Sequence, residues 1–141
     1  MADLYHNLKI EASASRVFDA FSRPEHLNNW WTLESSGQPE VGEIYRLYFG
    51  DPYDWRFRVS RSERNNIFEW KVQSADKDWE PTSVGIELKE VNDGVTVNFY
   101  HINWPEDNDH YKHSNYCWAH LLNGLKKYVE EGTIIPFDER A

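Results

Sequence analysis

The stretch IEASASRVFDAFSRPEHLNNWW, residues 10–31, decides how this chain begins to fold. The alternating pattern of residues 4–12, which leads into it, predicts a β-strand. Ser13 or Ser15 can then cap a short helix, because a hydroxyl oxygen accepts a hydrogen bond from a free N–H of the first turn. Pro24 suits a first helical position, so a second short helix is expected to end at the two tryptophans.

Trp30 and Trp31 are not expected to point into one core together. Neighbouring side chains lie on opposite faces of a strand and about 100° apart on a helix. We therefore expect Trp30 to pack beneath the short helices and Trp31 to cover or line the mouth of a cavity. The alternative is that both rings make structural contacts only, because large aromatic side chains often fill space in a core.

A repeat of two residues replaces the helical pattern after the tryptophans. Five runs alternate between apolar and polar residues, and they occupy residues 42–50, 53–63, 65–74, 80–91 and 94–103. The turn Asn92-Asp93-Gly94 is a strong hairpin signal, because its residues tolerate a positive φ. Short connections between consecutive strands predict an antiparallel meander with one buried face.

The alternation assigns the buried face of each of these strands. The inward residues are expected to be Tyr45, Leu47 and Phe49; Trp55, Phe57 and Val59; Phe68, Trp70 and Val72; Val84, Ile86 and Leu88; and Val95, Val97 and Phe99. His101 follows in the same register. It lies on the concave face if the last strand continues past Tyr100, and in the following loop if the strand ends there.

A long C-terminal helix is predicted from about Asp109 and is ended by Gly132. Its apolar residues fall on one stripe: Tyr111, Trp118, Leu121, Leu122, Leu125 and Val129. Such a stripe has to be buried against another element. We therefore expect the helix and the concave face of the sheet to share one core.

This order of elements resembles the START-like, or SRPBCC, superfamily. The stretch quoted first looks like the opening of the heat-shock-protein ATPase activator homologue-like branch, and CWAHLLNGLKKYVEEG, residues 117–132, looks like its closing helix. The resemblance implies an α+β helix-grip fold. A curved antiparallel sheet would wrap around the long C-terminal helix, with two short helices after the first strand.

The resemblance covers roughly residues 4–132 and implies a shape more than an activity, since proteins of this shape include ligand carriers, chaperone co-regulators and cyclases. The chaperone activators that name the branch carry an additional N-terminal domain, whereas this sequence starts at the first strand. We therefore expect a single START-like domain over residues 1–141 that binds a ligand by itself.

The composition limits the partners that this chain can bind. With 24 acidic and 15 basic residues, its formal net charge is −9. Nucleic acids and anionic membranes both favour clustered Lys and Arg, so neither is expected as a partner. The single Cys117 excludes an internal disulfide, and no apolar leader or long apolar span is present. We expect a cytoplasmic monomer or homodimer.

Motifs of the common enzymes are absent from the sequence, including glycine-rich phosphate loops, Gly-x-Ser-x-Gly and His-Glu-x-x-His. We therefore expect no catalytic residue and no cofactor. His110, His113, Cys117 and His120 share one flank of the closing helix, and such residues can bind Zn²⁺ in pairs. Because the four span about 15 Å of helix, we interpret them as a solvated flank and expect no metal.

Aromatic residues make up 16 % of the chain, and its seven tryptophans exceed what a core of this size needs. Ligand pockets are mostly apolar with a few polar groups. The residues expected to bind a ligand between sheet and closing helix are Trp31, Tyr45, Trp55, Phe57, Trp70, Phe99, His101, Trp118 and Leu122. For the tryptophans and Phe99, the alternative is plain core packing.

The sequence thus favours a binding protein for a small apolar or aromatic ligand. A second hypothesis is a chaperone or stress-response interaction module, which the name of the branch suggests and the acidic surface permits. A third is an enzyme that uses His101 for acid–base chemistry on a bound ring. No acid can be assigned beside His101 for this third function, because Glu69 and Glu87 alternate outward.

Overall fold

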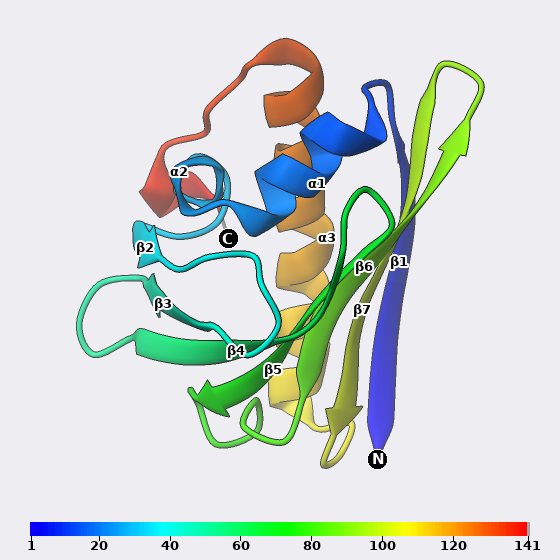
Figure 1. Ribbon diagram of the computed structural model, residues 1–141. Helices are drawn as coiled ribbons and strands as arrows, with labels where there is room; N and C mark the ends of the chain where they lie inside the picture. Colours follow the sequence, from blue (N-terminus) through cyan, green and yellow to red (C-terminus); the bar gives the residue numbers. More distant parts are fainter. Residues whose placement is uncertain (141) are drawn as a thin grey trace.

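The fold is a curved antiparallel sheet of seven strands that packs on a long helix, as a computed structural model of residues 1–140 shows (Figure 1). The strand order is β1-β7-β6-β5-β4-β3-β2. The strands are β1 (Ala2–Ile10), β2 (Glu34–Ser36), β3 (Ile44–Tyr48), β4 (Asp54–Glu63), β5 (Ile67–Ser74), β6 (Ser83–Val91) and β7 (Gly94–Trp104). Six of them agree with the alternation pattern. The three residues of β2 are too few to show a period of two.

The helices begin and end where local chemistry predicts. They are α1 (Ala14–Ser22), α2 (Pro24–Leu27), α3 (Asp109–Glu131) and the 3₁₀ turn η1 (Phe137–Glu139). The Ser13 side chain caps α1 by accepting a hydrogen bond from the Arg16 N–H, and Pro24 opens α2. Gly132 ends α3 with a φ of 74°, a left-handed conformation that glycine adopts without strain.

The alternation assigned the concave face of the sheet correctly. All the inward residues predicted for β3 to β7 are buried, except Phe49 and Trp55, which are half-buried. β7 continues to Trp104, so His101 belongs to the strand and points inward, opposite Val84 of β6. The loop position for His101 is therefore excluded.

The helix α3 lies along the concave face of the sheet, while α1 and α2 cover one end of it (Figure 1). The stripe predicted on α3 is buried at Trp118, Leu121, Leu122, Leu125 and Val129, and Tyr111 is half-buried at its margin. These residues belong to one hydrophobic cluster together with the inward residues of the strands. Sheet and helix therefore share a core, as in a helix-grip fold.

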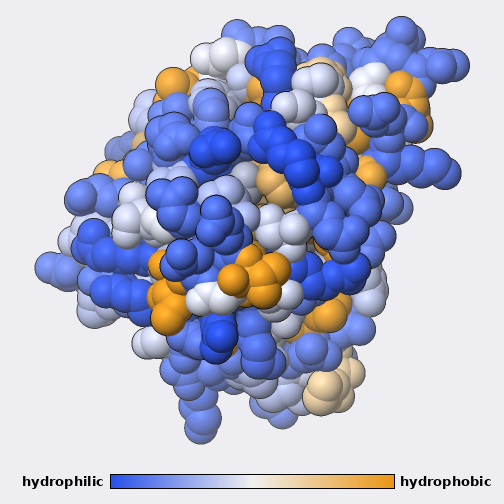
Figure 2. All heavy atoms as spheres, viewed as in Figure 1, coloured by the Kyte–Doolittle hydropathy of each residue, from blue (hydrophilic) through white to orange (hydrophobic). Residues whose placement is uncertain are grey.

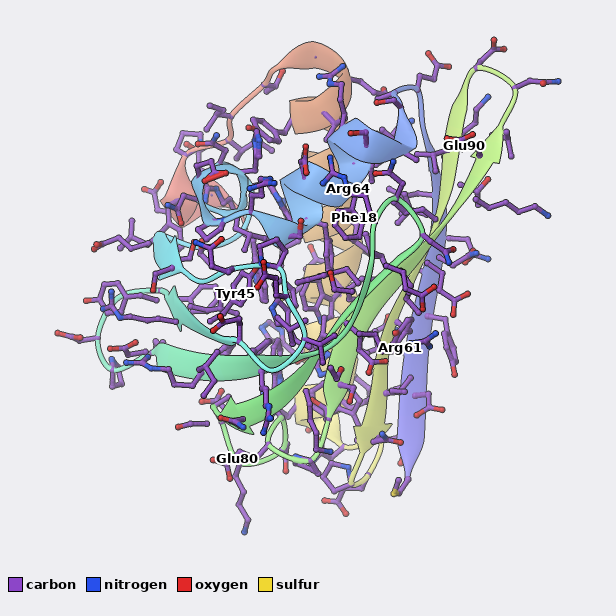
Figure 3. All side chains as sticks on the ribbon, viewed as in Figure 1. Phe18, Tyr45, Arg61, Arg64, Glu80 and Glu90 are labelled. Atoms are coloured by element: carbon purple, nitrogen blue, oxygen red, sulfur yellow. The ribbon has the colours of Figure 1, made fainter. Side chains whose placement is uncertain are left out.

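Contacts made by Arg64 and Tyr45 attach α1 to the sheet. Arg64, in the turn between β4 and β5, lies beside Phe18 of α1 with its guanidinium carbon 5.4 Å from the ring centre (Figure 3). The same guanidinium is hydrogen-bonded to Asp19 and pairs with its carboxylate. From below, the buried Tyr45 of β3 donates its hydroxyl to the Ser22 carbonyl at the end of α1. The short helices are thus held over one end of the core.

The face of the molecule drawn in Figure 2 is largely hydrophilic, with apolar residues in small separate groups. Among the helices of residues 1–140, none is long and apolar enough to cross a membrane.

Leu122 tests the assignment of the α3 stripe. Its side chain is 2 % exposed, so Leu122→Ala should lower the free energy of unfolding by about 2–5 kcal/mol, the range for a buried leucine. Urea denaturation measures the change. The neighbouring Asn123 is exposed, and Asn123→Ala should change stability by less than about 0.5 kcal/mol. Equal effects of the two substitutions would show that the stripe is misplaced.

Candidate functional site

A cavity of about 290 Å³ lies between the β3–β4 end of the sheet, α3 and the C-terminal tail. Most of its wall is aromatic, formed by Trp31, Phe49, Trp55, Trp79, Trp118 and Phe137. The remaining lining residues are Ser114, Cys117, Leu121, Asp138 and Arg140. Ligand pockets usually measure roughly 300–1,000 Å³, so this cavity suits a small molecule rather than a long lipid.

The two neighbouring tryptophans after α2 stack on each other, with ring centres 6.0 Å apart, but they face different surroundings. Trp30 lies beneath α1, where its Nε1 donates a 2.9 Å hydrogen bond to the Ala20 carbonyl. Trp31 is 5 % exposed and lies on the cavity side, with its ring centre 5.1 Å from that of Trp118. Both rings are buried in one hydrophobic core, because the turn after α2 lets them stack, so the expectation that they would not share a core was wrong. As expected, Trp31 also borders the cavity and Trp30 does not.

Trp55 and Trp79 continue this wall, since Trp79 stacks on Trp118 with ring centres 6.1 Å apart. Trp55 is the second residue of β4, and Trp79 lies in the connection between β5 and β6, yet their ring centres are only 4.8 Å apart. Phe49 packs 4.9 Å from Trp55 on the other side. Trp79 Nε1 donates a 3.4 Å hydrogen bond to Ser114 Oγ of α3. The connection is thereby tied to the helix.

A buried chain of hydrogen bonds holds two of the wall tryptophans. Trp118 Nε1 donates to His101 Nδ1 at 3.0 Å, so the imidazole proton has to reside on Nε2. His101 Nε2 then donates to Thr82 Oγ1 at 2.8 Å, and the Thr82 hydroxyl donates to the Trp79 carbonyl. Every member of the chain is satisfied while His101 is neutral.

Burial lowers the pKa of His101 from 6.5 to about 3, with a smaller contribution from the charge of His110. The imidazole is completely shielded from solvent beneath Trp79 and Trp118. It therefore positions the cavity wall and does not face the cavity. An acid–base role for His101 on a bound ring, the third hypothesis from the sequence, has no support in this geometry.

The polar lining of the cavity comes mainly from the tail. Arg140 is 7 % exposed, and its Nε and Nη1 donate to the carbonyls of Ile135 and Thr32 at 2.8 and 3.0 Å. Burial lowers the pKa of this guanidinium. Asp138 lies at the rim and is exposed. Burial raises the pKa of the Cys117 thiol, which keeps it neutral and poorly nucleophilic at pH 7.

The structure brings three of the nine predicted ligand-binding residues to the cavity: Trp31, Trp55 and Trp118. The other six do not line it and are buried elsewhere: Tyr45, Phe57, Trp70, Phe99, His101 and Leu122. Alternation places a side chain on the concave face but does not say what covers it. Trp31 lies over Phe57 and Trp70, and Trp118 lies over Phe99, so the second layer is shielded from the cavity.

Eight lining residues were not predicted as ligand contacts: Phe49, Trp79, Ser114, Cys117, Leu121, Phe137, Asp138 and Arg140. Phe49 and Leu121 were assigned only to the core. One signal pointed to Trp79, because a tryptophan among the polar residues of a turn needs a partner. The tail residues carry no periodicity, so no pattern in the sequence connects them to the cavity.

The polar flank of α3 is occupied by separate pairs. His110 Nδ1 lies 3.1 Å from Asp78 Oδ2, and His113 Nε2 lies 3.4 Å from Cys117 Sγ. Across residues 1–140, no three His, Cys, Asp or Glu side chains are grouped so that they could hold one metal ion.

Comparison with known proteins identifies a family and solved structures that share this fold. The family model described as activator of Hsp90 ATPase homolog 1-like protein matches residues 11–130. No curated protein matches the chain. The Aha1 dimer from Colwellia psychrerythraea is 29 % identical, with a TM-score of 0.86 over 94 % of this chain and 99 % of that chain.

Two more distant solved structures share the fold. A protein from Staphylococcus saprophyticus is 22 % identical, with a TM-score of 0.81 over 95 % of this chain and 96 % of that chain. CalU16 from Micromonospora echinospora is 18 % identical, with a TM-score of 0.77 over 98 % of this chain and 83 % of that chain. At these identities the likeness extends to the fold alone.

The tryptophan pair should separate in stability measurements. Trp30→Ala should lower the free energy of unfolding by about 3–5 kcal/mol, because it removes a fully packed ring and leaves the Ala20 carbonyl unpaired. Trp31→Ala should cost less, because one face of the ring borders a cavity and makes no contacts there. Chemical denaturation of both variants measures the difference. A larger loss for Trp31→Ala would reverse the two roles.

His101 should make the fold sensitive to acid. The pKa of His101 is about 3 in the folded chain and 6.5 in the unfolded chain. Between these two pH values His101 is protonated in the unfolded state but stays neutral in the folded state. The free energy of unfolding should therefore be highest above pH 6.5 and should fall as the pH approaches 3, by roughly 2 kcal/mol between pH 6 and 4. Denaturation at several pH values should show a shallower fall for His101→Gln. Parallel curves would mean that His101 is not held neutral.

Proposed function

This chain belongs to the activator of Hsp90 ATPase homolog 1-like family of START-like proteins, and from that premise we propose that it binds one small apolar or aromatic molecule in the cavity beside Trp31. The observation that carries the proposal is the cavity itself, about 290 Å³ in volume and walled by four tryptophans. Aromatic walls with a few polar groups are typical of small-molecule sites.

The cavity is supported from behind and cannot easily collapse. Trp79 is anchored to Ser114, and Trp118 is anchored to His101, so the two stacked rings are held in place in the cavity wall. An unfilled apolar space costs stability, because its lining atoms lack contacts on one side. A chain that holds such a space open with buried hydrogen bonds is best explained by a molecule that fills it.

The proposal also includes the setting in which the protein works. We infer a single START-like domain over residues 1–141 that acts in the cytoplasm, and the unpaired Cys117 supports a reducing compartment. A homodimer is supported by the relative from Colwellia psychrerythraea, whose structure is that of a dimer. The lack of an exposed acid–base pair in the described cavity lining favours binding without catalysis.

A chaperone-interaction role is the second candidate, favoured by the family description and by the 29 % identity to an Aha1 protein. In this role the chain would bind an Hsp90-type chaperone and raise its ATPase rate. An ATPase assay with added chain tests this directly. If the cavity-filling variant Cys117→Phe still stimulated the chaperone ATPase, ligand binding and chaperone binding would belong to different surfaces.

Filling the cavity should abolish ligand binding. Cys117→Phe adds a ring to the lining, so the affinity for the neutral fluorescent probe N-phenyl-1-naphthylamine should fall at least tenfold. Fluorescence titration measures the affinity. Native mass spectrometry of freshly purified protein should show a bound small molecule in the unaltered chain and none in Cys117→Phe.

Asn115→Phe is the matched control. It adds the same ring two residues away, at an exposed position of α3 that does not line the cavity. Its probe affinity should equal that of the unaltered chain. Probe binding that is unaffected by Cys117→Phe, in a variant that melts normally, would contradict binding in this cavity.

A further inference from the structure

Arg140 places a buried positive charge at the edge of the aromatic cavity. Two of the five N–H groups of its guanidinium donate to backbone carbonyls, those of Ile135 and Thr32. No carboxylate of residues 1–140 comes within 4.0 Å of its nitrogens to form an ion pair. The remaining N–H groups therefore lack an anionic partner in the described part of the chain.

Buried arginines are usually paired with carboxylates, whereas in this chain the paired arginines are exposed ones. The arginines that pair with carboxylates have side chains that are 37–52 % exposed, and they are Arg23, Arg46, Arg56, Arg61 and Arg64. Among the described residues Arg140, Arg16 and Arg58 have no such pair, and of these three only Arg140 is buried. A buried charge is costly unless it is neutralised and hydrogen-bonded, and the described residues give Arg140 hydrogen bonds but no counter-charge.

We propose that the molecule bound in this cavity is a small aromatic monocarboxylate, whose carboxylate pairs with Arg140 and whose ring lies against the tryptophan wall. The inference rests on the proposed binding function and names its ligand class. The planar fork of a guanidinium matches a carboxylate with two parallel hydrogen bonds. The ring can stack on the wall, since offset aromatic pairs are favourable.

The charges around the cavity limit the ligand to one negative charge. Arg140 is the cationic side chain of the lining, and the exposed Asp138 at the rim repels anions. The chain as a whole carries a net charge of −9. A phosphate dianion would bring a second charge against indole rings without a partner, so a carboxylate is favoured.

Two probes of almost equal shape test the proposal. Isothermal titration calorimetry with the full chain at pH 7 should show 2-naphthoate binding at least tenfold tighter than 2-naphthamide, which has the same ring and no charge. Arg140→Gln should remove that preference. Arg58→Gln, an equal charge change at an exposed position outside the cavity, should keep it. Asp138→Asn should tighten naphthoate binding about two- to threefold and leave naphthamide unchanged.

The outcomes separate this inference from the proposed function. Equal binding of both probes by the unaltered chain would contradict the proposal of a carboxylate ligand but would still support binding of an aromatic molecule in the cavity. Binding of neither probe would overturn both. Because Arg140 also anchors the tail, thermal melts must show that Arg140→Gln is folded. If it is not, the unaltered chain and Asp138→Asn decide, and an unchanged naphthoate affinity in Asp138→Asn would contradict a carboxylate beside the rim.

Discussion

The structure depends on one constraint, which is that a single long helix must cover the apolar face of a seven-stranded sheet. Strands spaced about 4.8 Å apart make such a sheet roughly 29 Å wide, whereas a helix with its side chains is only about 10–12 Å across. The sheet therefore curves around α3, and α1, α2 and the tail cover what the helix leaves. The cavity lies where these covers meet, so it follows from the coverage of the sheet.

Large aromatic rings fill the space between the wide sheet and the narrower helix. Trp70, Phe57 and Phe99 fill the layer next to the sheet, and the rings of Trp31 and Trp118 lie over them. A polar chain through His101 fixes the upper layer, where apolar contact alone would permit several ring orientations. Buried polar groups of this kind are stable only when all of them are hydrogen-bonded. Here the donors of Trp118, His101 and Thr82 each have an acceptor.

Alternation and helical periodicity predicted the longer strands, the long helix and their buried faces, because both report which face of an element is buried. The resemblance to START-like proteins implied how these elements are arranged. They identified the inward register as far as Phe99 and the end of α3 at Gly132, and they left the position of His101 open. They could not separate cavity lining from core, because that depends on what packs above each residue. Trp79 and Arg140 reach the site from a turn and from the tail, where chain direction is set by tertiary contacts that leave no repeat in the sequence.

The tail forms one side of the cavity through Phe137, Asp138 and Arg140. Residues 133–136 form no helix or strand, so lifting the tail breaks no sheet hydrogen bonds and leaves α3 in place. Arg140 holds the closed tail through the Thr32 carbonyl while it lines the cavity. An anion bound there would neutralise the same guanidinium, so ligand binding and tail closure would stabilise each other.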